Sequence, residues 1–262
     1  MKPKISEFSY GYALTEELIK GFGSSITAAP VFPSLYQEGK KGGGWDVKLK
    51  RGGIPLFIQF KLSHYLKKKN AKERISGYFS SPYYRMHIRP KKDSKQHELL
   101  LELENLGNEV YYSAPGFHEP SELNDAYLGK QVKNKSIWVK PTDVGHINDD
   151  DEHYIAFQLL PEKWFFCSKP KIIERDLSFS SFSESVISIL HQKRESALTR
   201  ESLIELAGKL EEIGIKRTDI SLEDEVLVKE ILSDRHPIEL VSYYSSIYFN
   251  SQLIILQQAN EI

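Results

Sequence analysis

The fold expected for this chain is decided by one run of residues, Gly44-Trp45-Asp46-Val47-Lys48-Leu49-Lys50-Arg51-Gly52-Gly53-Ile54-Pro55-Leu56-Phe57-Ile58-Gln59-Phe60-Lys61. Its two halves have the composition of β-strands, and two glycines separate them. Because glycine tolerates the positive φ that tight hairpin turns require, the run predicts a β-hairpin.

Polar side chains are expected to converge at the open end of this hairpin. Alternate residues of a strand share a face, so Gln59 and Lys61 point one way while Ile58 and Phe60 point the other. Hairpin strands are antiparallel and about 5 Å apart, which brings Asp46 beside Gln59 and Lys61. A carboxylate, an amide and an amine at one place could hold a divalent ion.

The composition is that of an ordinary globular protein. The chain has 262 residues, 40% of them apolar, and one cysteine, which excludes an intramolecular disulfide. The amino terminus lacks the apolar core of a secretory signal, so the cytoplasm is the expected location. The stretch 240–260 carries no charge, but frequent Ser, Asn and Gln interrupt it, and a buried helix or a subunit interface is expected there instead of a membrane span.

Charge is unevenly distributed along the chain. Residues 40–95 contain sixteen Lys or Arg and three Asp or Glu, although the net charge of the whole chain is −1. This separation indicates that the basic segment faces a polyanion, and a solvated charged face is the alternative.

Helical and strand patterns alternate through the first 160 residues. Helices are expected at 12–22, 94–106 and 120–129, and strands at 26–36, 109–114, 136–140 and 153–160. Such alternation is typical of an α/β core with a central mixed sheet flanked by helices. After Pro170 the pattern is helical, with start signals at Ser183 and Thr199 and a stop at Pro237. The expected domains are therefore 1–176, and an all-helical C-terminal domain, 177–262.

Over about residues 8–140, the order of these elements and the motif Asp46 followed by Gln59-x-Lys61 resemble the PD-(D/E)XK nucleases, the restriction endonuclease-like superfamily. The Gln variant is most similar to its Mrr-like branch. The resemblance implies a restriction endonuclease-like core and a nuclease, with a role in host defence, such as restriction or antiviral defence.

The resemblance also implies roles for individual residues. Asp46 would be the metal-binding aspartate, Gln59 would stand at a position that commonly holds Glu or Asp, and Lys61 would be the motif lysine. Glu17, with Glu16 as the second choice, would be the helical acid. Helical geometry places Glu17 nearer the buried side of its helix and Glu16 nearer solvent.

Magnesium chemistry agrees with these residue types. Mg²⁺ takes oxygen ligands and keeps several waters, so Asp46, the Gln59 amide oxygen, the backbone carbonyl of Phe60 and a phosphate oxygen would suffice, with Glu17 holding a metal-bound water or a second ion. Mg²⁺ or Mn²⁺ is the expected cofactor. Lys61 would polarise the attacking water and offset charge on the phosphate.

The basic segment supplies the expected contacts to nucleic acid, with DNA as the expected polymer. The candidate phosphate-binding residues are Lys67, Lys68, Lys69, Arg74, Arg85 and Arg89. Aromatic residues between them could stack on bases. Alternatively, Tyr83, Tyr84 and Met86 form the core of an additional strand.

Two other classes of function remain open from the sequence. A neutral Gln59 weakens metal binding, which is compatible with a catalytically inactive nucleic-acid-binding or assembly module. The helices after residue 176 could instead dock a partner protein or form a homodimer.

Overall fold

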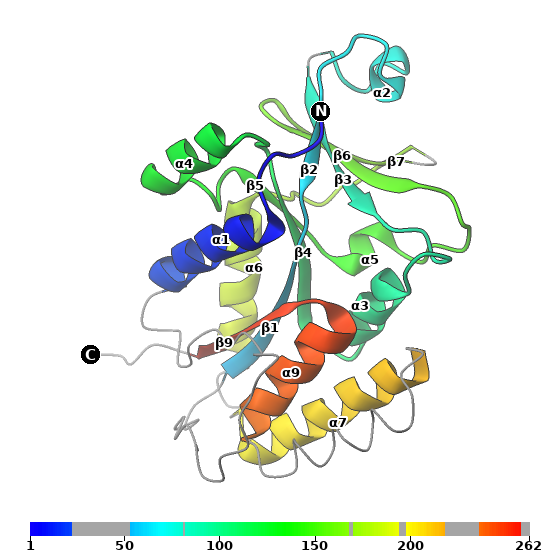
Figure 1. Ribbon diagram of the computed structural model, residues 1–262. Coiled ribbons are helices and arrows are strands. Elements are labelled where there is room, and N and C mark those ends of the chain that lie inside the picture. The colour runs from blue at the N-terminus through cyan, green and yellow to red at the C-terminus, as the bar shows by residue number, and fades with distance from the viewer. Residues whose placement is uncertain (23–52, 81, 168–169, 194–197, 218–235, 258–262) are drawn as a thin grey trace. The chain divides into compact units, whose positions relative to one another are not determined.

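The computed structural model describes residues 1–22, 53–80, 82–167, 170–193, 198–217 and 236–257 (Figure 1). Its helices are α1 (Glu7–Phe22), α2 (Lys72–Ile75), α3 (Gln96–Asn105), α4 (Pro120–Leu128), α5 (Pro141–Val144), α6 (Phe179–Gln192), α7 (Arg200–Arg217) and α9 (Pro237–Phe249). Its strands are β1 (Gly53–Phe60), β2 (Ser63–Leu66), β3 (Tyr83–Ile88), β4 (Glu109–Pro115), β5 (Ser136–Val139), β6 (His153–Leu159), β7 (Glu162–Cys167), β8 (Lys171–Ile172) and β9 (Gln252–Gln257). The predicted α/β class is confirmed.

The chain divides into two compact units that interleave in sequence. Unit 1 holds the described parts of 1–21, 60–97 and 111–185, and unit 2 holds those of 22–59, 98–110 and 186–262. Each unit takes residues from both sides of position 176. The separation of 1–176 from 177–262 as folding domains stays a prediction.

Unit 1 contains a five-stranded antiparallel sheet of order β2-β3-β6-β7-β8. In its register Met86 of β3 lies opposite Ile155 of β6, which lies opposite Phe166 of β7. Tyr83 and Met86 are fully buried, and Tyr83 stacks on Phe79 with ring centroids 4.4 Å apart. The basic segment therefore supplies an additional strand, and core packing is confirmed for these two side chains.

Helix α1 begins earlier than its apolar stripe indicates, because Ser6 caps it. The Ser6 hydroxyl accepts a hydrogen bond from the Ser9 backbone N–H at 3.0 Å. Further along the helix, Gly11 packs so closely on the ring of Phe60 that a Cβ would lie 2.7 Å from it. A side chain at position 11 would displace this ring.

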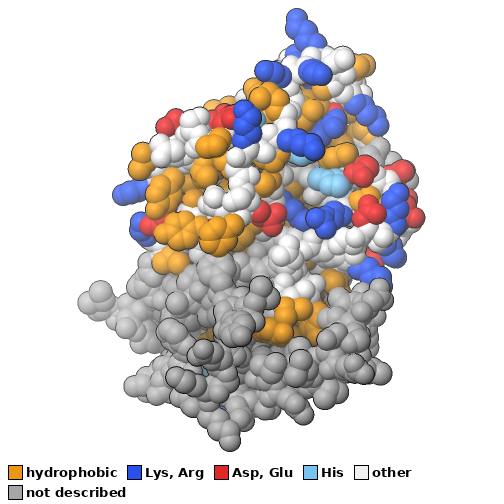
Figure 2. Space-filling model, in the orientation of Figure 1, with side chains coloured by type: hydrophobic (Ala, Val, Ile, Leu, Met, Phe, Trp, Pro, Cys, Tyr) orange, Lys and Arg blue, Asp and Glu red, His pale blue; other side chains and the backbone are white. Residues whose placement is uncertain are grey.

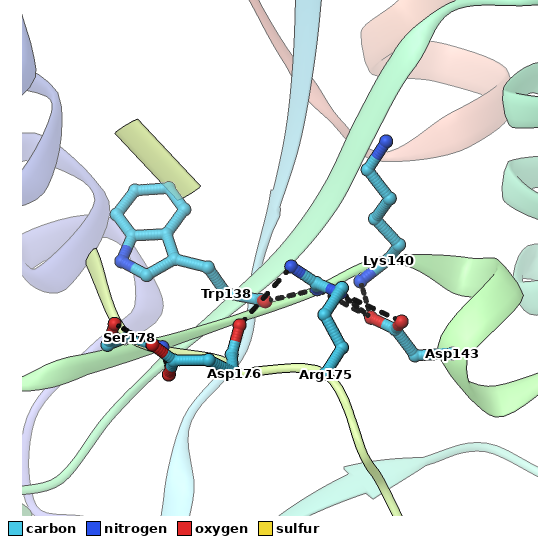
Figure 3. Close-up of polar contacts among 6 residues, drawn as sticks. All are labelled: Trp138, Lys140, Asp143, Arg175, Asp176 and Ser178. Carbon is cyan, nitrogen blue, oxygen red and sulfur yellow. Dashed lines mark hydrogen bonds and ion pairs between the residues drawn. The ribbon is translucent and has the colours of Figure 1, made fainter. Parts of the chain in front are cut away.

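Arg175, in the chain between β8 and α6, forms an ion pair with α5 and a hydrogen bond with β5 (Figure 3). The guanidinium of Arg175 donates from Nε to both carboxylate oxygens of Asp143 at 2.9 Å, and from Nη2 to the Trp138 carbonyl at 2.7 Å. Asp143 also accepts from the Lys140 backbone N–H at 2.7 Å, which closes the first turn of α5. The Asp143 carboxylate thus links two connections of unit 1 that are separated in sequence, the one from β5 to α5 and the one from β8 to α6.

Unit 2 contains helices of the predicted C-terminal region. The stripe expected on α7 is confirmed, since its members are buried: Leu203, Ala207, Leu210 and Ile213. Thr199 caps α7 as predicted, because its hydroxyl accepts from the Ser202 backbone N–H at 3.1 Å. Helix α9 packs against α7, with the ring of Tyr248 over Gly214.

The expectation that residues 177–262 are entirely helical is wrong. Asn250 adopts a left-handed conformation with φ of 46° and ends α9, and the chain then forms β9. Strand β9 pairs antiparallel with β1, with Ile58 opposite Gln252. Pro237, predicted as a stop, instead opens α9, where a missing N–H costs nothing.

The second sheet has the strand order β5-β4-β1-β9 and is mixed, as predicted. Its pairs β1 with β9 and β4 with β5 are antiparallel. Among the described residues, no helix has both the length and the apolar character needed to cross a membrane.

Candidate functional site

Gln59 is the second-to-last residue of β1, and its environment in unit 2 is unusual. The side chain is 0% exposed, and neither Oε1 nor Nε2 has a hydrogen-bond partner among the described residues. Leaving a buried amide unpaired costs about 1–3 kcal/mol of stability. A ligand that accepts or donates a hydrogen bond, or a cation that coordinates Oε1, would offset this cost.

Lys61 follows β1 by one residue and belongs to unit 1. Its backbone N–H donates to the Ser113 carbonyl at 2.9 Å, which continues the strand-like hydrogen bonding past the end of β1. Its ammonium Nζ donates to the side-chain Oε1 of Gln96 at 3.0 Å. The amine is therefore held in a fixed place at the start of α3.

Burial perturbs the ionisation of this lysine. The pKa of Lys61 is lowered to about 8, chiefly by desolvation; the negative charge of Glu7 opposes this shift, and the positive charge of Arg89 adds to it. Although Glu7 as a residue is exposed, neighbouring atoms crowd its carboxylate and raise its pKa. An amine with a pKa near neutrality is typical of catalytic and ligand-binding positions.

A small pocket surrounds the Lys61 side chain in unit 1. It is lined by Lys61, Ile88, Arg89, Ser94, Gln96, His97 and Tyr112. His97 is fixed at its wall, since its two ring nitrogens lie 2.9 Å from the Tyr112 hydroxyl and 2.8 Å from the Gly145 carbonyl. These partners come from segments far apart in sequence, and Gln96 and His97 carried no signal that linked them to Lys61.

Glu17 is buried as predicted, with 6% of its surface exposed, and Glu16 is more accessible. The two carboxylate oxygens of Glu17 accept hydrogen bonds from the backbone N–H groups of Val132 and Lys133, each at 3.0 Å. Glu16 pairs with Lys20 and accepts from the Tyr127 hydroxyl. Both acids therefore have structural partners in unit 1, and a role in metal binding stays a prediction.

The metal-ligand set predicted from the sequence is described only in part. Asp46 lies outside the described residues. Among those described, no group of three or more His, Cys, Asp or Glu side chains is placed to hold a metal ion. Among the predicted ligands that the structure describes, Gln59 is the one whose side chain is buried without a hydrogen-bond partner in the described residues.

The predicted nucleic-acid-binding residues differ in accessibility. Lys67, Lys68 and Lys69 are exposed in the turn from β2 to α2, where Figure 2 shows Lys and Arg side chains at the tip of the molecule. Arg74 instead donates to the carbonyls of Lys67 and Ser80, at 3.1 and 2.8 Å, and holds this turn together.

Arg85 lies within β3 and Arg89 directly follows it, and the two side chains have opposite environments. Arg85 pairs with the buried carboxylate of Glu73 and lies over the ring of Tyr154, 5.0 Å from its centroid. Arg89 is exposed and has no hydrogen bond or ion pair with any residue in the described parts of the chain. Arg89 is therefore the more available of the two for a ligand.

The Glu73 carboxylate, which belongs to no motif predicted from the sequence, accepts hydrogen bonds from Arg85 and from the hydroxyl of Tyr83. Burial acts to raise the pKa of Glu73, but these two partners outweigh burial and lower it overall. Glu73→Gln should reduce the free energy of unfolding at pH 7 by about 2 kcal/mol, because Arg85 loses its counter-charge but keeps partial access to solvent.

The direction of the pKa shift of Glu73 determines how the stability difference between wild type and Glu73→Gln depends on pH. A carboxyl with a lowered folded-state pKa stabilises the protein above its unfolded-state pKa, and this contribution disappears as the pH falls through the folded-state pKa. The gap between wild type and Glu73→Gln should therefore close below about pH 4 in urea titrations. A gap of equal size at pH 7 and pH 3, or a similar loss in the exposed control Lys72→Gln, would contradict the assignment.

No protein-family model, curated protein or solved structure matches this chain.

Proposed function

We propose that this protein is a metal-dependent nuclease that hydrolyses phosphodiester bonds of DNA. The observation that carries the proposal is the position of Lys61, a desolvated amine held by Gln96 directly after a strand whose buried Gln59 amide has no described partner. The buried amine of Lys61 and the unpaired amide of Gln59 both lower the stability of the fold, and residues that lower stability concentrate at functional sites.

The residues present fit a hard divalent ion in part. The unpaired Oε1 of Gln59 is a suitable oxygen donor, and Asp46 and the Phe60 carbonyl are the other proposed ligands. A bound Mg²⁺ or Mn²⁺ would supply Lewis acidity and an activated water. Since the Glu17 oxygens already accept two backbone hydrogen bonds, we assign Glu17 chiefly to positioning the turn at Val132.

Lys61 supplies positive charge where charge develops in the reaction. A pKa of about 8 leaves the ammonium as the main form at neutral pH, so Nζ can donate to a phosphate oxygen. Burial makes this interaction stronger than it would be in water, since the effective dielectric constant is lower. Gln96 keeps the amine in place in the absence of substrate.

The exposed basic turn at Lys67–Lys69 supports a polyanionic substrate. Contacts to phosphates are independent of sequence and weaken steeply with salt. The turn would hold the strand while the site around Lys61 acts on one phosphodiester.

A catalytically inactive nucleic-acid-binding module is the second candidate. It is favoured by the neutral Gln59 and by the engagement of the Glu17 carboxylate with two backbone amides. Such a protein would retain salt-dependent binding of DNA without turnover.

Cleavage assays separate the two candidates. Plasmid, linear duplex, single-stranded DNA and RNA would be incubated with Mg²⁺ or Mn²⁺ and either wild type or Asp46→Ala of matched folding. We expect cleavage of DNA by wild type only. Salt-dependent binding with no turnover of any substrate would favour the inactive module, and cleavage by Asp46→Ala at the wild-type rate would exclude the proposed metal site.

A further inference from the structure

The pocket around Lys61 contains further polar groups that, together with the lysine, suit a phosphate. Lys61 and Arg89 both line it, so two positive charges face one small space. The charges of Lys61 and Arg89 act on each other, and the carboxylate of Glu7 acts on both of them. An anion bound at this pocket would contact both cations.

The other polar groups of the pocket also suit an anion. The Ser94 hydroxyl accepts a hydrogen bond from the Gln96 backbone N–H at 3.2 Å, and its own proton is available to donate. Gln96 is the first residue of α3, and helix amino termini favour negative charge. The pocket thus combines a point charge, a planar guanidinium and a hydroxyl donor.

We infer that Lys61, Arg89 and Ser94 bind one phosphate group of a nucleic-acid strand, with Arg89 as the residue that positions this phosphate. The inference deepens the proposed function and rests on it for the identity of the ligand. Arg89 suits the role because its guanidinium can approach two phosphate oxygens at once, and none of its donors is used by a described residue. The phosphate is either an internal diester or a terminal monoester, which present the same oxygens with different charge.

The test measures binding in EDTA, where no metal-dependent cleavage takes place. Fluorescence anisotropy would report the affinity for a single-stranded DNA 12-mer, with and without a 5′-phosphate, over a series of NaCl concentrations. The variant is Arg89→Gln, and the matched control is Lys95→Gln, which removes an exposed neighbouring cation that does not line the pocket.

Arg89→Gln should weaken binding about tenfold and lower the salt slope by about 1, while Lys95→Gln changes affinity by less than about twofold. A preference of wild type for the 5′-phosphorylated strand that Arg89→Gln abolishes would identify a terminal monoester; equal loss for both strands would identify an internal diester. Equal effects of Arg89→Gln and Lys95→Gln, or no effect of Arg89→Gln, would overturn the inference.

Failure of this inference can be distinguished from failure of the nuclease proposal. Arg89-dependent binding by a wild-type protein that cleaves nothing would retain the phosphate pocket and reject the enzyme. Cleavage by wild type with unchanged binding by Arg89→Gln would retain the enzyme and reject the pocket.

Discussion

Replacing Lys61 with alanine should slow metal-dependent DNA cleavage by about 100-fold or more while leaving the protein folded. Removing one preorganised hydrogen-bond donor from a site where negative charge develops typically costs 10²–10³ in rate. The structure supports an effect at the upper end, since burial around Lys61 excludes the water that would otherwise compensate for the loss.

The variants around Lys61 separate its charge from its packing. Lys61→Met keeps the length of the side chain and loses the ammonium, so it should be as inactive as Lys61→Ala. Lys68→Ala removes an exposed cation from the basic turn and should weaken binding without changing the single-turnover rate at saturating enzyme. The measurement is single-turnover cleavage of a labelled duplex at saturating enzyme.

Two outcomes would contradict the role given to Lys61. If Lys61→Ala cleaved DNA at more than a tenth of the wild-type rate under single-turnover conditions, the amine would have no part in the chemistry. If Lys68→Ala reduced the cleavage rate as much as Lys61→Ala, the reduction would reflect the loss of one positive charge anywhere on the basic segment and not the position of Lys61. Urea titration of each variant would confirm that folding is retained.

The sequence was sufficient to predict the elements whose signals are local. The apolar stripe of α7, its Thr199 cap and the strand that leads to Gln59 all follow from periodicity or from turn residues within a few positions. Burial of Glu17 also follows from 100° per residue on α1. These features are confirmed because no distant partner is needed to define them.

Features that depend on distant pairing were missed. Strand β9 pairs with β1 across about 200 residues, and nothing in the charge-free stretch that contains it favoured a strand over a longer helix. Strand β7 was missed for a local reason, since it follows β6 through Leu160-Pro161, which lacks the Asn-Gly or Asp-Gly signal of a two-residue hairpin turn.

The candidate site shows the same division between local and distant signals. Spacing within the chain identified Gln59 and Lys61, but the contact of Lys61 with Gln96 joins residues 35 positions apart. The partners of Glu17 are backbone N–H groups at Val132 and Lys133, which no side-chain motif could reveal. Residue type predicted the candidates, and only the fold showed which groups already had structural partners.

Gln59→Leu should make the protein more stable and at the same time abolish most of its activity. Leucine has similar size and removes two buried polar atoms that have no described partner, so the free energy of unfolding in EDTA should rise by about 1–2 kcal/mol. If Gln59 is a metal ligand, its loss should slow cleavage by about 100-fold or more, because metal coordination contributes several kcal/mol to the transition state.

Gln59→Glu is the matched variant, because it keeps the shape and adds a charge. In EDTA the buried carboxylate should make this variant less stable than wild type, and saturating Mg²⁺ should restore stability by binding only the folded state. A metal-binding role thus predicts opposite changes in the stability of the two variants without metal, and a large metal-induced gain for Gln59→Glu alone.

The alternative is that Gln59 is a structural residue whose partners lie outside the described parts of the chain. Gln59→Leu would then destabilise the protein by about 1–3 kcal/mol, since those partners would become unpaired in turn. Urea titrations of wild type and both variants, with EDTA and with Mg²⁺, distinguish the cases before any cleavage is measured. A destabilised Gln59→Leu, together with a Gln59→Glu variant that gains nothing from Mg²⁺, would remove Gln59 from the metal site and leave the inactive binding module as the better explanation.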